Sequence, residues 1–75
     1  MRKNKRLRKL FKDAKRSHAP SMYSIGILYE LGRLTGRSDM AAAAEWISDA
    51  ADMGYEPAVE WMLDYRLPDD AYEIG

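Results

Sequence analysis

The sequence contains no cysteine and only one histidine, His18. Disulfide bonds and thiolate metal sites are therefore excluded, and a metal bound by His18 would have no second histidine as co-ligand. A catalytic histidine needs an orienting partner and usually a nucleophile, and the sequence offers no such set. We therefore predict a protein that is not an enzyme and holds no metal or cofactor. His18 is predicted to be a partly exposed residue between two helices.

Long apolar segments are also missing. No run approaches the roughly 20 apolar residues of a membrane-spanning helix, and the basic start of the chain is not followed by the apolar stretch of a signal peptide. We therefore expect a cytoplasmic protein with no membrane partner. A chain of 75 residues predicts a single domain with a small core, because so short a chain buries only about 60% of its unfolded surface.

The net charge of zero hides a strong separation of charge along the chain. Residues 1–16 hold nine basic residues and one acidic residue, a net charge of +8. Residues 39–75 hold ten acidic residues and one basic residue, a net charge of −9. This pattern indicates either two partners of opposite charge or contact between one part of the protein and another.

Apolar residues recur at helical spacing, and no segment shows the period of two that is typical of a strand. Leu7, Leu10, Phe11 and Ala14, for example, form one apolar stripe on an otherwise basic helix. We therefore predict an all-α domain of three to four antiparallel helices. Its segments are a basic helix (about 4–16), a full helix-pair repeat (about 19–54), a half repeat (about 56–66) and a tail (67–75).

The segment from Asp39 to Gly54 is the most completely specified helix. Asp39 is a good N-cap because its carboxylate can accept from free N–H groups of the first turn, and Gly54 can adopt the positive φ of a helix C-terminus. Six alanines lie between them and allow another helix to approach closely. Gly26, inside the preceding helix, costs about 1 kcal/mol relative to alanine, so a close helix–helix contact is predicted there too.

The chain matches itself weakly at an offset of 37 residues, which indicates a helix-pair repeat flanked by two half repeats. The matched pairs are Leu10 and Ile47, Ala14 and Ala51, Ser17 and Gly54, Pro20 and Pro57, and Ile25 and Met62.

Residues 17–58 resemble a Sel-one-like repeat, a relative of the tetratricopeptide repeat. The family pattern places small, aromatic and glycine residues at set positions in two helices. Those positions are filled here by Ser21, Ile25, Gly26, Tyr29, Gly32, Ala43, Trp46, Ala50, Ala51 and Gly54. Three features depart from the pattern: Ser21 replaces an alanine, Ile47 replaces an aromatic residue, and the loop is one residue longer. In the last helix, Leu63 occupies the repeat position that corresponds to Gly26.

This resemblance implies a short right-handed αα-hairpin solenoid that binds proteins or peptides and has no catalytic residues. We therefore predict a non-enzymatic protein–protein interaction module or adaptor. Tyr23 and Trp61 are the candidate binding residues, because aromatic side chains on the concave face of such a repeat are good anchors for a partner.

The two charged ends supply the other candidate residues, Arg6 and Lys9 in the first helix and Glu60 and Asp64 in the last. Repeat proteins generally need about three repeats and polar ends, so this chain is predicted to associate with itself or with a larger partner. Two alternatives stay open. The basic helix could bind nucleic acid through its lysines and arginines, or the chain could be a small stand-alone inhibitor that docks on a larger protein complex.

Overall fold

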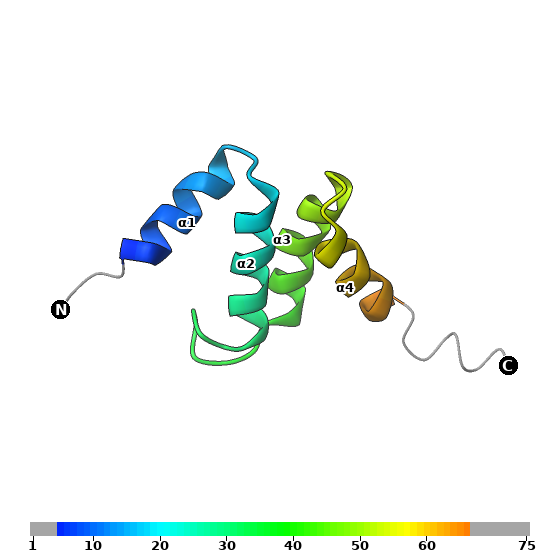
Figure 1. Cartoon of the computed structure of the whole chain (residues 1–75). Coiled ribbons are helices and arrows are strands. Elements are labelled where there is room, and N and C mark those ends of the chain that lie inside the picture. The colour runs from blue at the N-terminus through cyan, green and yellow to red at the C-terminus, as the bar shows by residue number, and fades with distance from the viewer. Residues whose placement is uncertain (1–4, 67–75) are drawn as a thin grey trace, which may run out of the picture.

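The computed structural model describes residues 5–66, and this part of the chain folds into four α-helices without any strand (Figure 1). The helices are α1 (Lys5–Lys15), α2 (Ala19–Glu30), α3 (Met40–Asp52) and α4 (Glu56–Arg66). The prediction of an all-α protein is confirmed. The predicted tail over residues 67–75 and the first residue of the basic helix, predicted from about residue 4, lie outside the described residues.

The ends of α3 follow the two local signals in the sequence. The Asp39 carboxylate accepts a hydrogen bond of 3.0 Å from the backbone N–H of Ala42, which satisfies one of the free donors of the first turn. Gly54, just after the helix, has a φ of +87°, a conformation that glycine adopts without a Cβ clash. Both predicted ends of this helix are confirmed.

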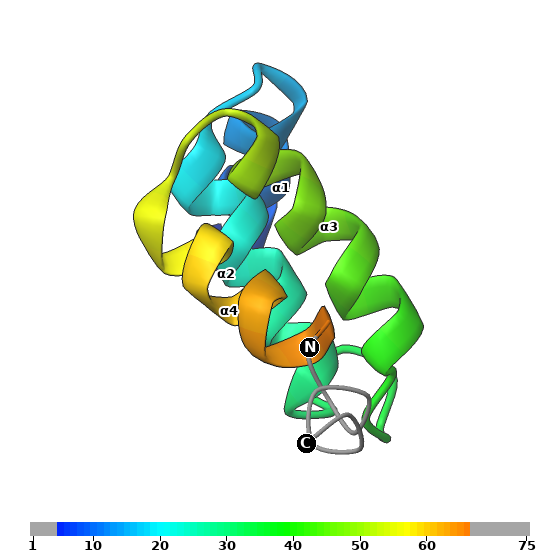
Figure 2. The same ribbon diagram turned by 90° about the vertical axis from the view of Figure 1, so that its right-hand side faces the viewer.

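Helix α2 lies at the centre of the packing, with α1 and α3 against it, and α3 also packs against α4. Ile25 of α2 and Ile47 of α3 are the largest fully buried side chains. Phe11 of α1 meets Trp46 of α3 edge to face, with ring centroids 5.8 Å apart. Seen from its end, the molecule has α2 and α4 on one side and α3 on the other (Figure 2).

Gly26 is the point of closest approach between α2 and α3. A Cβ atom on Gly26 would lie 2.8 Å from Cδ1 of Ile47 and 3.0 Å from the carbonyl oxygen of Ala43. Only a residue without a side chain fits at this distance, because real Cβ contacts below 3.0 Å essentially never occur. The close helix–helix contact predicted at Gly26 is confirmed.

The α1–α2 turn and the α3–α4 turn share one pattern of hydrogen bonds. Five backbone bonds of the first turn recur in the second, with donor and acceptor both moved by 37 residues. The donors are Arg16, Ser17, His18, Ser21 and Met22 in the first turn, and Met53, Gly54, Tyr55, Ala58 and Val59 in the second. Ser17 even adopts a φ of +64°, matching Gly54, although this left-handed conformation costs a non-glycine residue about 1–2 kcal/mol.

Candidate protein-interaction surface

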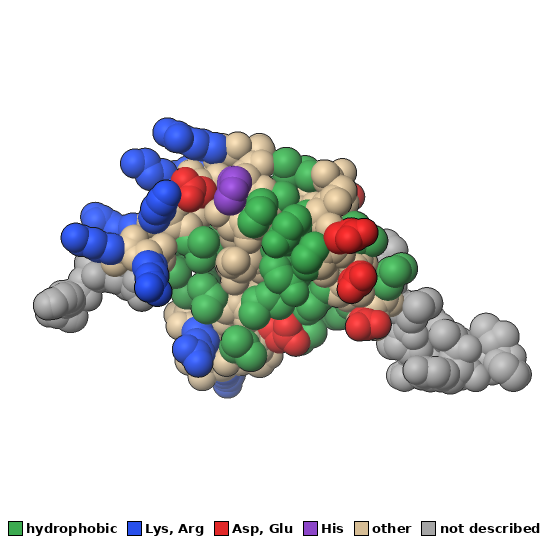
Figure 3. Space-filling view, viewed as in Figure 1, with side chains coloured by type: hydrophobic (Ala, Val, Ile, Leu, Met, Phe, Trp, Pro, Cys, Tyr) green, Lys and Arg blue, Asp and Glu red, His purple; other side chains and the backbone are tan. Residues whose placement is uncertain are grey.

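One face of the molecule divides into three zones of different chemistry. Apolar side chains run down its centre, between lysines and arginines over α1 and acidic side chains over α4 (Figure 3). The two charged helices lie at opposite ends of the described chain (Figure 1), and among residues 5–66 no ion pair joins them. The opposite charges of the two ends are therefore left unmatched within the described part of one molecule.

The first candidate site is a hollow where α4 passes the end of α2 and the start of α3. It measures about 670 Å³ and is called the Trp61 hollow below. Its lining residues are Glu30, Met40, Trp61, Asp64 and Tyr65. Met40 is 39% exposed and Tyr65 is 43% exposed, so the rim of the hollow presents apolar and aromatic surface to solvent.

Trp61 is held in this hollow by one hydrogen bond and one stacking contact. Its Nε1–H donates to Oε1 of Glu30 over 3.0 Å, and a partly buried indole N–H usually has such a partner. Its ring stacks on Tyr65, with centroids 5.1 Å apart and planes inclined by 19°. Because Tyr65 follows Trp61 by four residues, the stacking contact follows from helical spacing, whereas the Glu30 contact joins residues 31 positions apart.

The second candidate site is a groove between α1 and α2, with a volume of about 780 Å³. It is called the α1/α2 groove below. Both apolar and charged residues line it. Its lining residues are Arg6, Leu7, Lys9, Leu10, Asp13, Tyr23, Ser24, Ile27, Leu28 and Arg33. The groove therefore combines an apolar surface with a net positive charge.

Tyr23 lies between this groove and the core. Its ring meets the ring of Tyr55 edge to face, with centroids 5.6 Å apart and planes at 65°, and it packs against the buried core cluster. This contact links α2 to the residue just before α4. Tyr23 is therefore only partly exposed, since the rest of its ring supports the fold.

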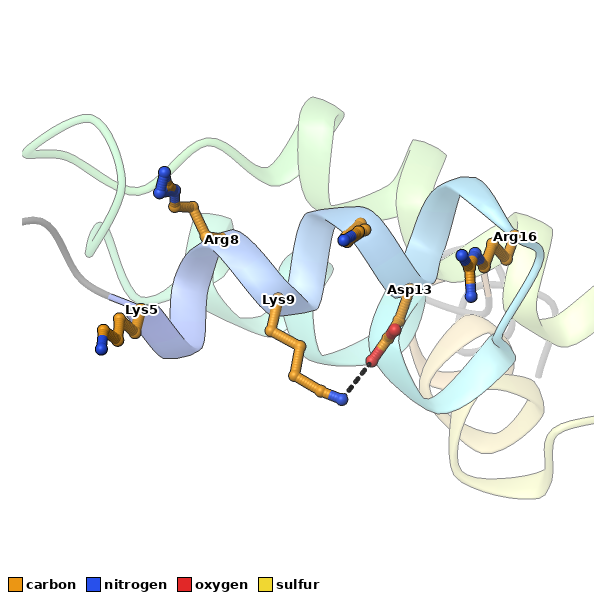
Figure 4. A pocket seen from close by; sticks show the side chains of 6 residues that line it. Lys5, Arg8, Lys9, Asp13 and Arg16 are labelled. Carbon is orange, nitrogen blue, oxygen red and sulfur yellow. Dashed lines mark ion pairs between the residues drawn. The ribbon is translucent and has the colours of Figure 1, made fainter.

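The third candidate site is the basic face of α1, shown in Figure 4. It has one acidic residue, Asp13, whose carboxylate lies 3.5 Å from Nζ of Lys9. The other lining residues are Lys5, Arg8, Lys12 and Arg16. Four of its five cations therefore have no carboxylate partner on this face.

An acidic stripe follows one side of α4. Glu56, Glu60 and Asp64 are all exposed and occur at intervals of four residues, which places them on the same face of the helix. Asp64 also lines the Trp61 hollow, whereas Glu60 lines none of the hollows described above.

His18 serves the local structure. Its Nδ1 lies 2.7 Å from Oγ of Ser21, a serine that is only 4% exposed, at the start of α2. Within residues 5–66, no group of three or more His, Cys, Asp or Glu side chains could hold a metal ion. No helix in the same part of the chain is both long and apolar enough to cross a membrane.

The six candidate residues from the sequence fall into two groups and one outlier. Trp61 and Asp64 share the Trp61 hollow; Arg6, Lys9 and Tyr23 share the α1/α2 groove; Glu60 stands on the acidic stripe. Sequence reasoning missed other lining residues. These are Glu30, Met40 and Tyr65 in the hollow, and Ile27, Leu28 and Arg33 in the groove. Only Tyr65 carried a usable signal, its helical spacing from Trp61.

Comparison with known proteins adds no assignment, since no family model, curated protein or solved structure matches this chain.

Proposed function

We propose that this protein is a non-enzymatic protein-binding module built as a short helical repeat of the Sel-one-like type. The main support for a repeat is the shared hydrogen-bond pattern of the α1–α2 and α3–α4 turns at an offset of 37 residues. In this view α2 and α3 form one full repeat, α1 is the second helix of a preceding repeat, and α4 is the first helix of a following one.

The Trp61 hollow is the proposed binding site. The observation that carries this proposal is that Trp61 is oriented by Glu30 and backed by Tyr65 while the rim of the hollow stays exposed. A preorganised aromatic side chain lowers the entropy cost of binding. Because Glu30 and Asp64 add negative charge beside two aromatic rings, the hollow favours a peptide segment that carries lysine or arginine.

The test replaces two exposed rim residues, Met40→Ala together with Tyr65→Ala, in a tagged protein used for affinity capture and quantitative mass spectrometry. We expect proteins captured by the wild type to fall by about tenfold or more, as for an aromatic anchor at an interface. The matched control replaces Leu31 and Met53, which are exposed by 61% and 50% and lie outside the hollow, with alanine. Equal capture by both double variants would contradict the proposal.

The basic face of α1 supports a second candidate function, binding of nucleic acid through phosphate groups. Four cations without a carboxylate partner on one helix face provide suitable contacts. For duplex DNA, each phosphate that they neutralise makes the slope of log K against the logarithm of salt concentration more negative by about 0.9. We expect Arg8→Glu with Lys12→Glu to abolish an electrophoretic shift of duplex or single-stranded probes. The control changes Arg33 and Arg37 to glutamate, which alters the net charge equally but leaves this face intact. An equal loss in both variants, or no shift with the wild type, would remove this function.

A further inference from the structure

The α1/α2 groove corresponds, at the offset of 37 residues, to a surface that is occupied elsewhere in the same chain. Arg6 and Leu10 on its α1 side correspond to Ala43 and Ile47 of α3, and Ser24 on its α2 side corresponds to Trp61 of α4. The groove is therefore the counterpart of the surface that α3 and α4 form together.

Helix α2 covers that α3/α4 surface. The backbone of Gly26 lies against Ile47 and Ala43, and the Glu30 carboxylate accepts the hydrogen bond from Trp61. Among residues 5–66, no helix covers the α1/α2 groove in the same way, since its lining residues bound an open volume of about 780 Å³. The groove therefore resembles the surface on which α2 packs, and it could accept a helix that packs as α2 does.

Helix α4 is the other helix of the α2 type in this chain. Pro57 matches Pro20 in the first turn, and Ala58 matches Ser21 as a buried small residue. On its uncovered side, Leu63 takes the position of Gly26 and is 53% exposed. Helix α4 therefore carries an exposed apolar side chain at the position that corresponds to Gly26, through which α2 contacts the α3/α4 surface.

Charge also matches the groove to α4. The groove is lined by Arg6, Lys9 and Arg33 against one acidic residue, whereas α4 exposes Glu56, Glu60 and Asp64. Electrostatic complementarity of this kind favours a specific register between two surfaces.

We propose that the α1/α2 groove binds α4 of a second copy of this chain, so that the molecules stack head to tail. This inference rests on the repeat arrangement of the proposed function, and its contact surface shares only Asp64 with the lining of the Trp61 hollow. Within one chain, Tyr23 of α2 contacts Tyr55. In the stack, Glu60 occupies the position of Tyr23, and His18 of the next copy occupies the position of Tyr55. Glu60 and His18 therefore face each other. Because the two surfaces differ, the contact does not close on itself and generates oligomers that grow with concentration.

Sedimentation velocity over a range of protein concentrations, at low and high salt, tests the stack. We expect the wild type to associate at low salt and to dissociate as salt screens the charges. Two variants should each weaken association by at least about tenfold: Arg6→Glu with Arg33→Glu in the groove, and Glu60→Lys with Asp64→Lys on α4. The groove variant leaves the Lys9–Asp13 pair in place.

Mixing these two variants provides the most specific result. One variant keeps an intact α4 and the other an intact groove, and their two charge-reversed surfaces are also complementary to each other. The mixture should therefore recover alternating oligomers that neither variant forms alone. Placing all four changes in one chain exchanges the charges of the two surfaces and should restore self-association. Matched controls are Arg8→Glu with Arg37→Glu, and Glu45→Lys with Asp49→Lys on α3. Both should associate like the wild type.

A wild type that stays monomeric at low salt and high concentration would overturn the proposal. This is the result expected if residues 67–75 or a different protein fill the groove instead of α4 of a second copy. Equal weakening by the control variants, or no complex in the mixture, would overturn it as well. Capture of partners through the Trp61 hollow is measured with the Arg6→Glu, Arg33→Glu variant. If that capture is retained while self-association is absent, the stack is wrong but the proposed function is not. Circular dichroism is used to check that every variant compared is helical.

Discussion

Replacing Gly26 with alanine is expected to lower the free energy of unfolding by about 1–3 kcal/mol, the usual range for overpacking a well-packed core. Alanine is the better helix former by about 1 kcal/mol, so propensity alone predicts the opposite sign. Packing wins because the new Cβ would meet Cδ1 of Ile47 at 2.8 Å and the carbonyl oxygen of Ala43 at 3.0 Å. Ile47 is fully buried and β-branched, so its side chain has little freedom to move away.

A double-mutant cycle with Ile47→Ala isolates this contact. Ile47→Ala alone should cost about 2–5 kcal/mol, but it removes the side-chain atoms that a Cβ on Gly26 would meet. In that background only the carbonyl oxygen of Ala43 remains close, at 3.0 Å, so Gly26→Ala should destabilise clearly less than it does in the wild type. Urea denaturation followed by circular dichroism measures all four proteins. If Gly26→Ala destabilises both backgrounds equally, the close approach at this glycine is wrong.

The second large effect is expected for Ile25→Ala in the centre of α2. Ile25 is fully buried, and deletion of a buried isoleucine side chain to alanine costs about 2–5 kcal/mol because it leaves a cavity. A single core in a domain below about 70–80 residues rarely supplies more than about 3–5 kcal/mol. We therefore expect a substantial unfolded population at room temperature, seen as a loss of helical circular dichroism and a low urea midpoint.

Leu63→Ala is the matched control for this loss of stability. It removes a similar apolar side chain from a helix, but Leu63 is 53% exposed, so the change should stay within about 0.5 kcal/mol. Both variants are measured at dilute protein concentration, where self-association does not contribute. Comparable destabilisation by the two changes would mean that the core is not centred on α2.

Helix limits were the most predictable part of the fold, because they depend on neighbours in the sequence. Asp39 and Gly54 mark the ends of α3 through hydrogen bonds and backbone angles within a few residues. Ser17 shows where this reasoning stops. Serine has no preference for positive φ, so its conformation follows from the turn that it closes and not from its side chain.

The candidate site was less predictable, because its contacts join distant parts of the chain. Trp61 could be chosen from its type and helical face. Its hydrogen bond to the Glu30 carboxylate could not be predicted, since the two residues are 31 positions apart. The same holds for Tyr23, whose contact with Tyr55 depends on how α2 and α4 are placed relative to each other.

The sequence by itself determined the four helices, the separation of charge between the two ends, and the offset of 37 residues that the two short turns share. These features depend on local hydrogen bonding, on residue type and on the order of residues along the chain. Only the tertiary structure decided which side chains share the Trp61 hollow and which line the α1/α2 groove. The physical reason is that hollows form where separate helices meet, and the angle and spacing of that meeting are set by packing at buried residues such as Gly26 and Ile47.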